Sequence, residues 1–219
     1  MPNEFLPDAL PTDPMGIVMG WFAEARTRAV QPNPDAMVLA SVGADGKPSA
    51  RVVLCRYVDA SGYVVFYTNY ESRKGRELTR LPRAAAVIHW DTLHRQIRIE
   101  GAVVRSPDAE SEVYFARREL MSRIGAWASQ QSQPLASRAA LADQVAVAAQ
   151  RFGITPGTDS GSIPRPPHWG GFRLWIDSLE LWVEGPGRIH DRAVWQRTLQ
   201  PRDEFSFVTG AWTSTRLNP

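Results

Sequence analysis

Cysteine is nearly absent from this sequence: Cys55 is the only one in 219 residues, which excludes a disulfide within the chain. Because disulfides are typical of oxidising compartments, this composition favours a cytoplasmic protein. Long apolar runs are absent too, and none approaches the length of a membrane-spanning helix. The N-terminus, Met-Pro-Asn-Glu-Phe, lacks the basic region and apolar stretch of a secretory signal. We therefore expect no membrane partner, and we expect Cys55 to be a buried thiol rather than a nucleophile.

Several ligand-binding patterns are missing as well. The four histidines are scattered and no Cys/His spacing of the zinc type occurs, so no metal site is predicted. The formal net charge of +2 is too small to indicate a nucleic-acid partner. No Gly-x-Gly-x-x-Gly motif follows a strand and no Walker-type loop is present, which argues against a parallel nucleotide-binding sheet.

The patterns that are present predict a mainly β protein, a β-rich α+β fold with an antiparallel barrel and peripheral helices. Short turns, such as Asp45-Gly46, join successive apolar segments. The expected strands are residues 36–42, 49–57, 63–68, 84–90, 95–105, 171–176, 179–184 and 189–196, with a further hairpin from 205–208 and 212–217. The expected helices are a first one that begins at Asp13-Pro14 and ends before Gln31, and residues 72–79, 107–117 and 137–152.

Three regions have little periodicity. Residues 1–12 are rich in proline, aspartate and asparagine, and we expect a flexible N-terminal arm there. Residues 153–167 are rich in glycine, proline, serine and threonine, which is typical of a long loop. Residues 124–132 fit neither the helical nor the strand period. We expect residues 13–219 to form a single domain.

The most informative segment is Tyr67-Thr68-Asn69-Tyr70-Glu71-Ser72-Arg73-Lys74, where an aromatic strand runs into a polar turn and a basic helix start. Its hydroxyl groups, its two adjacent cations and the backbone N–H groups of a helix N-terminus are the donors that a phosphate dianion needs. Ser-Arg-Lys also opens many solvated helices, so the motif alone leaves both interpretations open.

Four further segments carry more polar and aromatic side chains than packing requires. They are Arg51-Val52-Val53-Leu54-Cys55-Arg56, Arg95-Gln96, Gln131-Ser132, and Trp182 together with Arg188-Ile189-His190-Asp191-Arg192. This set suits a flat heterocycle with several acceptors and a phosphate tail, because it offers arginines that flank an apolar strand, a glutamine at a strand entry and an amide–hydroxyl pair.

Taken together and in this order, these strings resemble the pyridoxamine 5′-phosphate oxidase family. Ile124-Gly125-Ala126-Trp127, Trp169-Gly170-Gly171-Phe172 and the C-terminal Arg216-Leu217-Asn218-Pro219 add to the resemblance, which runs from about Ala36 to the last residue. It implies a split β-barrel that binds flavin mononucleotide (FMN), with a C-terminal dimerisation and substrate region at about 171–219. It also implies a homodimer with two flavin sites built across the interface.

The resemblance further implies an oxidase of vitamin B6 metabolism. Such an enzyme converts pyridoxamine 5′-phosphate and pyridoxine 5′-phosphate to pyridoxal 5′-phosphate with O2 as acceptor, giving H2O2 and, from the amine, ammonia. The implied cofactor contacts are Arg51, Val52, Val53, Leu54, Cys55, Arg56, Tyr67, Thr68, Ser72, Arg73, Lys74, Gln96, Gln131, Ser132, Trp182 and Arg192. The implied substrate contacts are Arg56, Tyr114, Arg118, Ser122, Arg188, Ile189 and His190, with Arg188 and His190 as catalytic residues over the pyridine ring.

Elementary geometry supports two of these pairs. One helical turn separates Tyr114 from Arg118, so both can point the same way. Arg188 and His190 are two residues apart, so on a strand they share a face. A planar guanidinium over the substrate ring could stack on it and align it.

Two departures from the family pattern stand out, and two alternative functions stay open. Arg56 stands where the family usually has lysine, and the arm lacks the Arg-x-x-Tyr segment that closes over substrate in many members. One alternative is a paralogous FMN oxidase that acts on another reduced heterocycle, as in phenazine biosynthesis. The other is a non-catalytic protein that binds flavin or pyridoxal phosphate. Retention of the implied phosphate- and pyridine-facing residues favours the main interpretation.

Overall fold

The computed structural model describes residues 4–155 and 161–219, so part of the predicted arm and part of the predicted loop at 153–167 lie outside the described residues. The helices are α1 (Met15–Thr27), α2 (Arg73–Arg80), α3 (Asp108–Ala116), α4 (Leu120–Ala128) and α5 (Arg138–Arg151), with single 3-10 turns at Asp91–Leu93 and Pro186–Arg188. Among the described residues, no helix is both long enough and apolar enough to cross a membrane.

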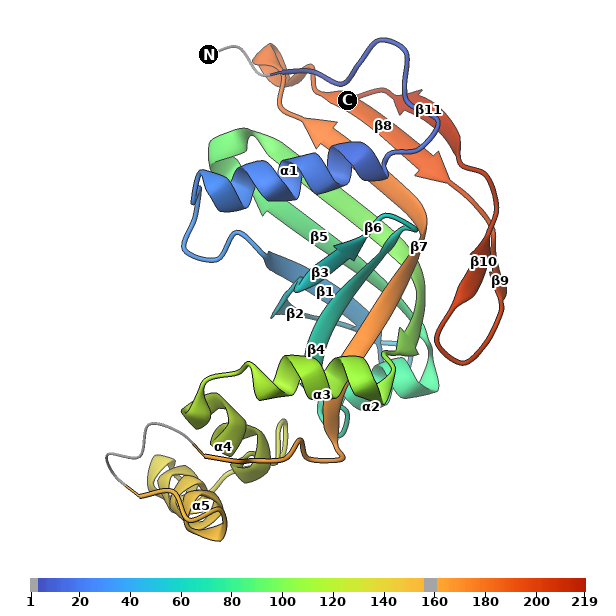
Figure 1. Cartoon of the computed structure of the whole chain (residues 1–219). Helices are drawn as coiled ribbons and strands as arrows, with labels where there is room; N and C mark the ends of the chain where they lie inside the picture. The colour runs from blue at the N-terminus through green and yellow to red at the C-terminus, as the bar shows by residue number, and fades with distance from the viewer. Residues whose placement is uncertain (1–3, 156–160) are drawn as a thin grey trace.

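The strands form one large antiparallel sheet and a small separate hairpin. They are β1 (Ala36–Val42), β2 (Pro48–Leu54), β3 (Tyr57–Asp59), β4 (Tyr63–Asn69), β5 (Arg83–Trp90), β6 (Arg95–Arg105), β7 (Trp169–Val183), β8 (Asp191–Gln196), β9 (Leu199–Pro201), β10 (Phe207–Thr209) and β11 (Thr213–Leu217). The order in the large sheet is β11-β8-β7-β6-β5-β1-β2, with β4 paired to β7 and β3 paired to β4. The sheet curls into a half-barrel with helices at its periphery (Figure 1), which confirms the predicted fold class.

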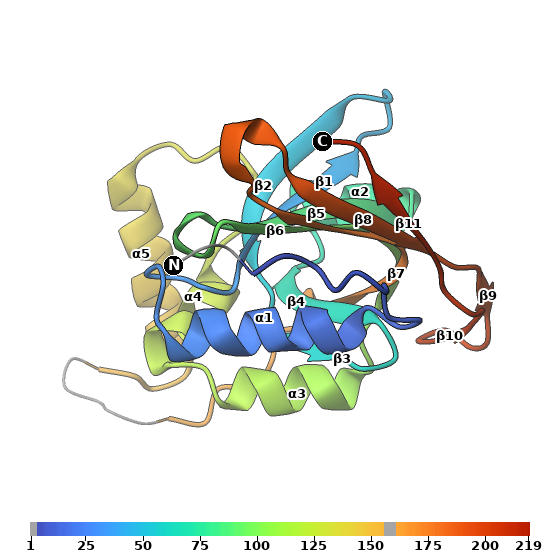
Figure 2. The same cartoon turned by 90° about the horizontal axis from the view of Figure 1, so that it is seen from above.

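The main core fills the curled sheet, and α1 lies across its open side (Figures 1 and 2). The apolar face of α1 repeats at helical spacing, and Val18, Phe22 and Ala25 are all at most 1% exposed. Phe22 meets Trp90 of β5 edge to face, with ring centroids 5.0 Å apart. Burial of this face therefore attaches α1 to the sheet.

The predicted hairpin between residues 205–208 and 212–217 is wrong. β10 pairs with β9, and β11 pairs with β8. A turn at Asp203 explains the difference, because its carboxylate accepts hydrogen bonds from the Phe205 N–H at 2.8 Å and from the Ser206 hydroxyl at 2.7 Å. Such a local side-chain bond reverses the chain, so the reversal falls before β10 and not after it.

Three other boundaries also differ from the prediction. The strand expected at 49–57 is broken, because the Cys55 N–H donates to the Asp35 carbonyl and the Arg56 N–H donates to that of Val65, both at 2.8 Å. The two strands expected from 171 to 184 form one continuous strand, β7. The segment 124–132, which fitted neither period, contains the second half of the short helix α4.

The described part of the N-terminal arm packs along β8 and β11. Leu6 is 5% exposed, and its N–H donates to Asp191 Oδ2 at 2.8 Å. Arg216 donates to the Pro7 carbonyl at 2.7 Å, and the Trp195 indole donates to the Pro11 carbonyl at 2.9 Å.

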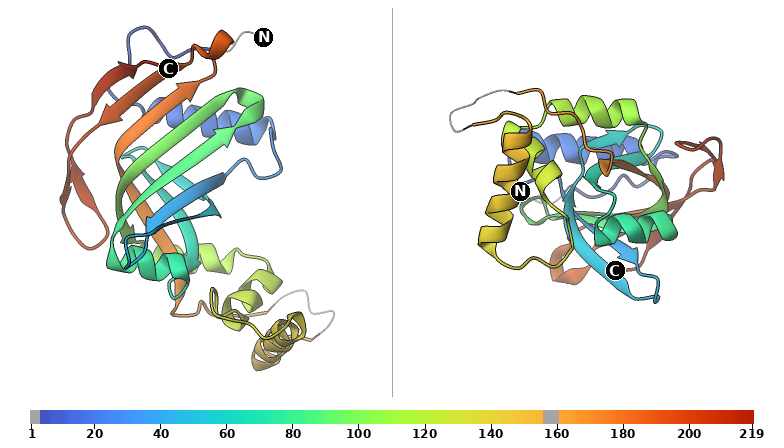
Figure 3. Two further views of the ribbon diagram at one scale, coloured as in Figure 1. Left: turned by 180° about the vertical axis from the view of Figure 1, so that it is seen from behind. Right: turned by 90° about the horizontal axis from the view of Figure 1, so that it is seen from below.

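The convex face of the sheet is free of helices over β6, β7 and β8 within the described residues (Figure 3). Val38 of β1 pairs with Val52 of β2, and these side chains are 44% and 64% exposed. Farther along the same face, Arg98 of β6 pairs with Glu180 of β7. The face therefore has an apolar part and an ionic part.

Gly101 is the position at which β6 changes its register against β7. A Cβ at Gly101 would collide with the backbone carbonyl of Trp175, which cannot move without breaking the sheet. We expect Gly101→Ala to lower the free energy of unfolding by about 1–3 kcal/mol. In α1, Gly16→Ala meets no atom within 4 Å and serves as the control, neutral or stabilising by about 0.5–1 kcal/mol. Urea unfolding at one protein concentration measures both, and equal midpoints for Gly101→Ala and the wild type would contradict the prediction.

Candidate functional site

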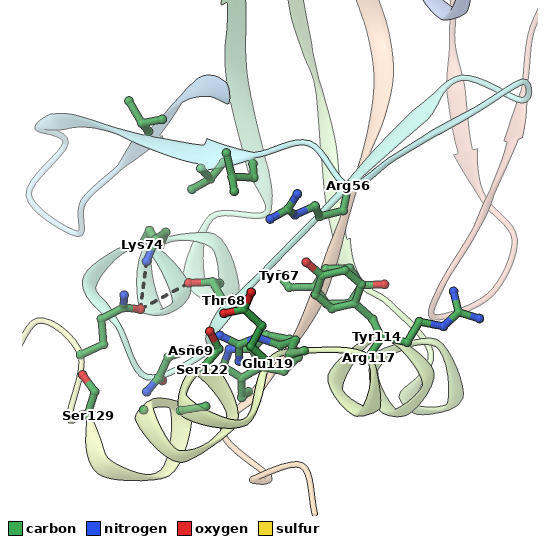
Figure 4. A pocket seen from close by; sticks show the side chains of 18 residues that line it. Arg56, Tyr67, Thr68, Asn69, Lys74, Tyr114, Arg117, Glu119, Ser122 and Ser129 are labelled. Carbon is green, nitrogen blue, oxygen red and sulfur yellow. Dashed lines mark hydrogen bonds between the residues drawn. The ribbon is translucent and has the colours of Figure 1, made fainter. Parts of the chain in front are cut away.

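One cavity of about 850 Å³ gathers residues from β2, β4, α2, α3, α4 and β7. It is lined by eight of the predicted cofactor contacts, namely Val52, Val53, Leu54, Arg56, Tyr67, Thr68, Lys74 and Gln131. Three further predicted substrate contacts, Tyr114, Arg118 and Ser122, line it as well. Figure 4 shows most of these side chains converging on the cavity. The cavity thus brings together residues that are distant in the sequence, from Val52 of β2 to Trp169 of β7.

The turn between β4 and α2 forms a polar cradle at one wall of this cavity. Ser72 is fully buried and caps α2: its hydroxyl oxygen accepts from the Gly75 N–H at 3.2 Å. Lys74 Nζ donates to Gln131 Oε1 at 3.1 Å, and the Thr68 hydroxyl donates to the same oxygen at 3.4 Å (Figure 4). A hydroxyl, an ammonium and a side-chain amide therefore meet beside a helix N-terminus, which is a favourable place for an anion.

Lys74 is the most perturbed cation of the cradle. Burial, and next the nearby Arg51 guanidinium, lower the pKa of Lys74 to about 8, while the Glu77 carboxylate opposes this shift. An ammonium that is costly to bury gains from an anionic ligand, because the ligand supplies the missing counter-charge.

Arg51 and Arg73, both predicted to contact the cofactor, lie beside the cavity and do not line it. Both form ion pairs with Glu77, at 3.1 Å from Arg51 NH2 and 2.8 Å from Arg73 Nε. Glu77 was not predicted as a site residue. Glu77 lies four residues after Arg73, so their contact along one face of a helix could be predicted from the sequence. Its contact with Arg51 depends on tertiary structure.

A second cation, Arg118, lies under an aromatic stack. Tyr67 and Tyr114 are stacked with ring centroids 3.8 Å apart, and Trp169 is 5.6 Å from Tyr67. The Arg118 guanidinium lies 4.6 Å from the Trp169 ring centroid, and its NH1 is buried with no hydrogen-bond partner among the described residues. Burial lowers the pKa of Arg118 and raises the pKa of Tyr67 to about 12. A buried guanidinium with an unused donor indicates a second anion position.

Trp169 and Glu119 also line the cavity, and neither was predicted as a site residue. Trp169 also packs on Phe115, at 5.1 Å between ring centroids. No local signal distinguishes a packing tryptophan from one that also forms the wall of a cavity. Glu119 precedes α4 and is the only carboxylate among the cavity-lining residues described.

A second group of predicted residues, the β8 group, lies where β6 starts, β7 ends and β8 begins, and it consists of Gln96, Trp182, Arg188, Ile189, His190 and Arg192. Gln96 pairs with Trp182, and Trp182 pairs with Arg192. The Trp182 and His190 rings are 4.6 Å apart between centroids. Arg188 lies in the 3-10 turn before His190 and has a left-handed backbone, at a φ of 66°, so the two residues do not share a strand as the sequence suggested.

Hydrogen bonds hold this second group in place. Arg192 donates through Nε to Glu180 Oε1 at 2.9 Å and through NH1 to the Asn218 carbonyl at 3.0 Å. His190 Nδ1 accepts from the Gly185 N–H at 3.3 Å. The neighbouring Ile189 is 72% exposed. Arg192 is thus positioned by β7 on one side and by the C-terminal segment on the other.

Within one chain the two groups do not meet. The cavity lies beside α3 and α4, whereas β8 begins near the chain termini, at the other end of the sheet (Figure 1). None of the residues of the second group lines the cavity, and Ser132 does not line it either. Cys55 is fully buried, and burial raises the pKa of its thiol to about 12. Only its backbone could serve a ligand, and its N–H is already bonded to Asp35.

Comparison with known proteins gives consistent matches along the chain. Residues 23–152 match the family model described as pyridoxamine 5′-phosphate oxidase, and residues 169–219 match the one described as pyridoxine 5′-phosphate oxidase C-terminal dimerisation region. A protein of Burkholderia cenocepacia (strain HI2424) named pyridoxine/pyridoxamine 5′-phosphate oxidase is 47% identical over 212 residues, 97% of this chain and 91% of the relative. A protein of Azorhizobium caulinodans with the same name is 46% identical, over 94% of this chain and 90% of the relative.

Two solved structures resemble the fold over nearly its whole length. PhzG from Burkholderia lata 383, solved in complex with tetrahydrophenazine-1-carboxylic acid, has a TM-score of 0.82 at 30% identity and covers 100% of this chain and 99% of its own. A pyridoxamine 5′-phosphate oxidase-related, FMN binding protein from Nostoc punctiforme PCC 73102 has a TM-score of 0.66 at 16% identity, with coverage of 93% and 96%. The second likeness shows a shared fold.

The sequence contains only two lysines, Lys47 and Lys74, so lysine labelled with 13C at Cε gives two NMR signals. We expect the signal of Lys74, assigned by its loss in Lys74→Arg, to titrate near pH 8 in the ligand-free protein. Because the folded state then binds this proton more weakly than the unfolded state, stability should rise as the pH increases from about 8 to the ordinary lysine pKa of 10.5. A midpoint above pH 10 would show that Lys74 is not desolvated.

Proposed function

The chain belongs to the pyridoxamine 5′-phosphate oxidase family, and we propose that it is an FMN-dependent oxidase that converts pyridoxamine 5′-phosphate and pyridoxine 5′-phosphate to pyridoxal 5′-phosphate. O2 is the acceptor, and the products are H2O2 and, from the amine, ammonia. One observation carries the proposal: a single cavity is lined by two separate cationic groups, the Lys74 cradle and the Arg118 guanidinium, whose NH1 has no hydrogen-bond partner among the described residues. A phosphorylated cofactor and a phosphorylated substrate need two such positions.

The chemistry of the cavity residues also fits FMN, for the phosphate as well as for the flavin ring. Thr68, Lys74 and Gln131 offer a hydroxyl, a cation and an amide to the cofactor phosphate. Among the described residues, β2 is the last strand in the sheet order, so no strand pairs with its outer edge. The backbone groups there can bond the polar rim of a flavin ring beside Val52, Val53 and Leu54. When bound, FMN accepts two electrons from C4′ of the substrate and passes them to oxygen.

Arg118 is the proposed anchor of the substrate phosphate, with Tyr114, Ser122 and Arg56 around it. The buried NH1 of Arg118 has no partner within the described residues, and a phosphate oxygen would satisfy it. Arg56 forms only a long ion pair, 3.8 Å from Asp35, so its charge is also accessible to the substrate. Two guanidinium groups suit a phosphate dianion through their paired N–H donors.

The β8 group belongs to the proposed site only in a homodimer. The C-terminal match is to a dimerisation region, and the convex face of the sheet carries exposed Val38 and Val52 beside the ionic pair of Arg98 and Glu180. In the proposed dimer, this face meets its counterpart, and the β8 group of one chain completes the cavity of the other. Arg188 and His190 then face the substrate ring, where Arg188 can stack on it and hold C4′ in position.

A reduced tricyclic heterocycle is the competing substrate, favoured by the close structural match to PhzG. A pocket for such a carboxylated tricycle has no need of a phosphate anchor. This cavity offers such a phosphate anchor: the Arg118 guanidinium, which lies against the Trp169 ring, and the Ser122 hydroxyl in the same lining. They favour a phosphorylated vitamer.

The deciding experiment follows oxidation of each phosphorylated vitamer and of the reduced phenazine by the purified, FMN-loaded protein. We expect pyridoxal 5′-phosphate and peroxide from the vitamers and little turnover of the phenazine. Arg188→Ala and His190→Ala should lower kcat/KM by about 10²-fold or more while FMN stays bound, since positioning is lost and the cofactor cradle is intact. Near-normal oxidation by both variants would exclude this face from the active site, and FMN binding without turnover of any substrate would favour a non-catalytic binder.

Subunit complementation tests whether each site uses two chains. Arg118→Ala removes a group from the cavity, and Arg188→Ala removes one from the β8 group, so each homodimer should be nearly inactive. When the two variants are unfolded together and refolded, about half of the dimers are hybrids, and each hybrid has one intact site and one doubly altered site. Activity should therefore return to about a quarter of the wild-type value. If the mixture stays as inactive as its parents, each site is contained in one chain.

A further inference from the structure

Glu77 is a buried carboxylate in the middle of α2, 7% exposed, with four hydrogen-bond donors directed at it. Its Oε2 accepts from the Ser41 hydroxyl at 2.6 Å, from the Ser49 hydroxyl at 2.7 Å and from Arg51 NH2 at 3.1 Å. Its Oε1 accepts from Arg73 Nε at 2.8 Å. Burial disfavours the charge, but the hydrogen bonds from Ser41, Ser49, Arg73 and Arg51 outweigh it and lower the pKa of Glu77 to about 2.

The two oxygens of Glu77 serve two different arginines. Oε2 belongs to the hairpin of β1 and β2, where Ser41 pairs directly with Ser49 and Arg51 also donates to both hydroxyls, at 2.5 Å each. Oε1 faces the start of α2, where Arg73 is the first helical residue. One carboxylate therefore fixes the distance between β2 and the N-terminus of α2.

The mode of contact leaves Arg73 able to bind a ligand. Within the described residues, Arg73 hydrogen-bonds only through Nε, and its side chain is 60% exposed. The two terminal NH2 groups of the guanidinium fork are the ones that bind phosphate oxygens in pairs. Glu77 thus holds the Arg73 guanidinium at Nε and leaves its two terminal NH2 groups available to a ligand.

Charge balance gives Glu77 a second effect on the same cradle. Arg51, Arg73 and Lys74 bring three positive charges close together before any anion is present. Arg51 disfavours the ammonium form of Lys74, and Glu77 favours it, so the carboxylate acts on the cradle lysine electrostatically. Without Glu77, the three cations would repel one another and the flexible Arg73 side chain would move into solvent.

We propose that Glu77 is a positioning residue for the phosphate of the flavin, holding Arg51 and Arg73 in place so that the cradle is preorganised before the cofactor binds. The inference rests on the proposed FMN cofactor. It assigns to Glu77 no contact with the ligand, only the orientation of groups that make such contacts. A cradle preorganised in this way binds more tightly because less side-chain entropy is lost on binding.

The test compares FMN with riboflavin, which lacks the phosphate, by fluorescence titration of the ligand-free protein. Glu77→Gln keeps an oxygen that can accept from Ser41 and Ser49. Its NH2 group, however, faces the Arg73 Nε–H, so two hydrogen-bond donors meet where a donor met a carboxylate oxygen. We expect the Kd for FMN to rise about tenfold or more, and the Kd for riboflavin to change less than about twofold. Glu71→Gln, in the exposed turn before α2, changes the net charge equally and should leave both constants unchanged.

A double-mutant cycle identifies the residue through which Glu77 acts. In an Arg73→Ala background, Glu77→Gln should weaken FMN binding much less than it does alone, because its partner is already absent. Arg73→Lys keeps the charge but loses the Nε donor and the fork, and it should reproduce the selective loss of FMN. This variant also provides the test if Glu77→Gln fails to fold.

Three outcomes would overturn the inference. Equal weakening of FMN and riboflavin by Glu77→Gln would show a general structural role, and so would additive effects in the cycle. Arg73→Lys with wild-type affinity for FMN would show that the orientation of the guanidinium is irrelevant. A wild-type protein that binds no FMN would overturn the proposed function first, and the titration of the wild type separates that failure from the others.

Discussion

The architecture depends on one strand, β7, which changes its partner halfway along its length. On one edge it pairs with β6 from end to end, across the register shift at Gly101. On the other edge its first half pairs with β4, through Trp175, and its second half pairs with β8, from Ser178 onwards. The sheet therefore divides at Ile176–Ser178: β4 turns inward to close the half-barrel, and β8 continues the open part.

This division determines where the functional groups lie. β4 leads directly into the polar cradle at Lys74, so the cavity forms at the end of the sheet where β7 begins. β8 starts opposite the last residue of β7, Val183, so His190 and Arg192 lie at the other end. If both groups belong to the proposed active site, one chain carries its two halves at opposite ends of the sheet. A second copy in the opposite orientation is then the simplest way to bring unlike halves together.

The local parts of this arrangement could be predicted from the sequence, and the long-range parts could not. The bounds of β1 and β6 follow from their side-chain alternation and their turns, and they agree with the structure to the residue. The missed reversal at Asp203 depends on one side chain bonding to its own turn, which no periodicity reveals. The continuity of β7 depends on pairing with β4 on one edge and β6 on the other, and both of these strands are distant in the sequence.

The candidate site shows the same contrast. Lys74 and Arg118 were identified because phosphate chemistry requires cations and hydroxyls in short motifs, or because a family string matched. Glu77 was missed because three of its four partners come from a hairpin about 30 residues away, and a lone glutamate in a basic helix resembles a solvated residue. Trp169 was missed as a site residue because packing and ligand contact impose the same demand for a large flat side chain.

The partner change of β7 also has a consequence for the order of events when the chain folds. β4 pairs early with the short β3, but its longer partner β7 follows only about 100 residues later, as the Tyr70 contact with Gly171 illustrates at a separation of 101. On the ribosome, the β1–β2 and β5–β6 hairpins can form early. The apolar side chains of β4, such as Phe66, remain exposed until β7 has been synthesised and can pair with β4. A nascent chain that is stalled before residue 169 should thus be recognised by chaperones, and complete chains should fold slowly for their size.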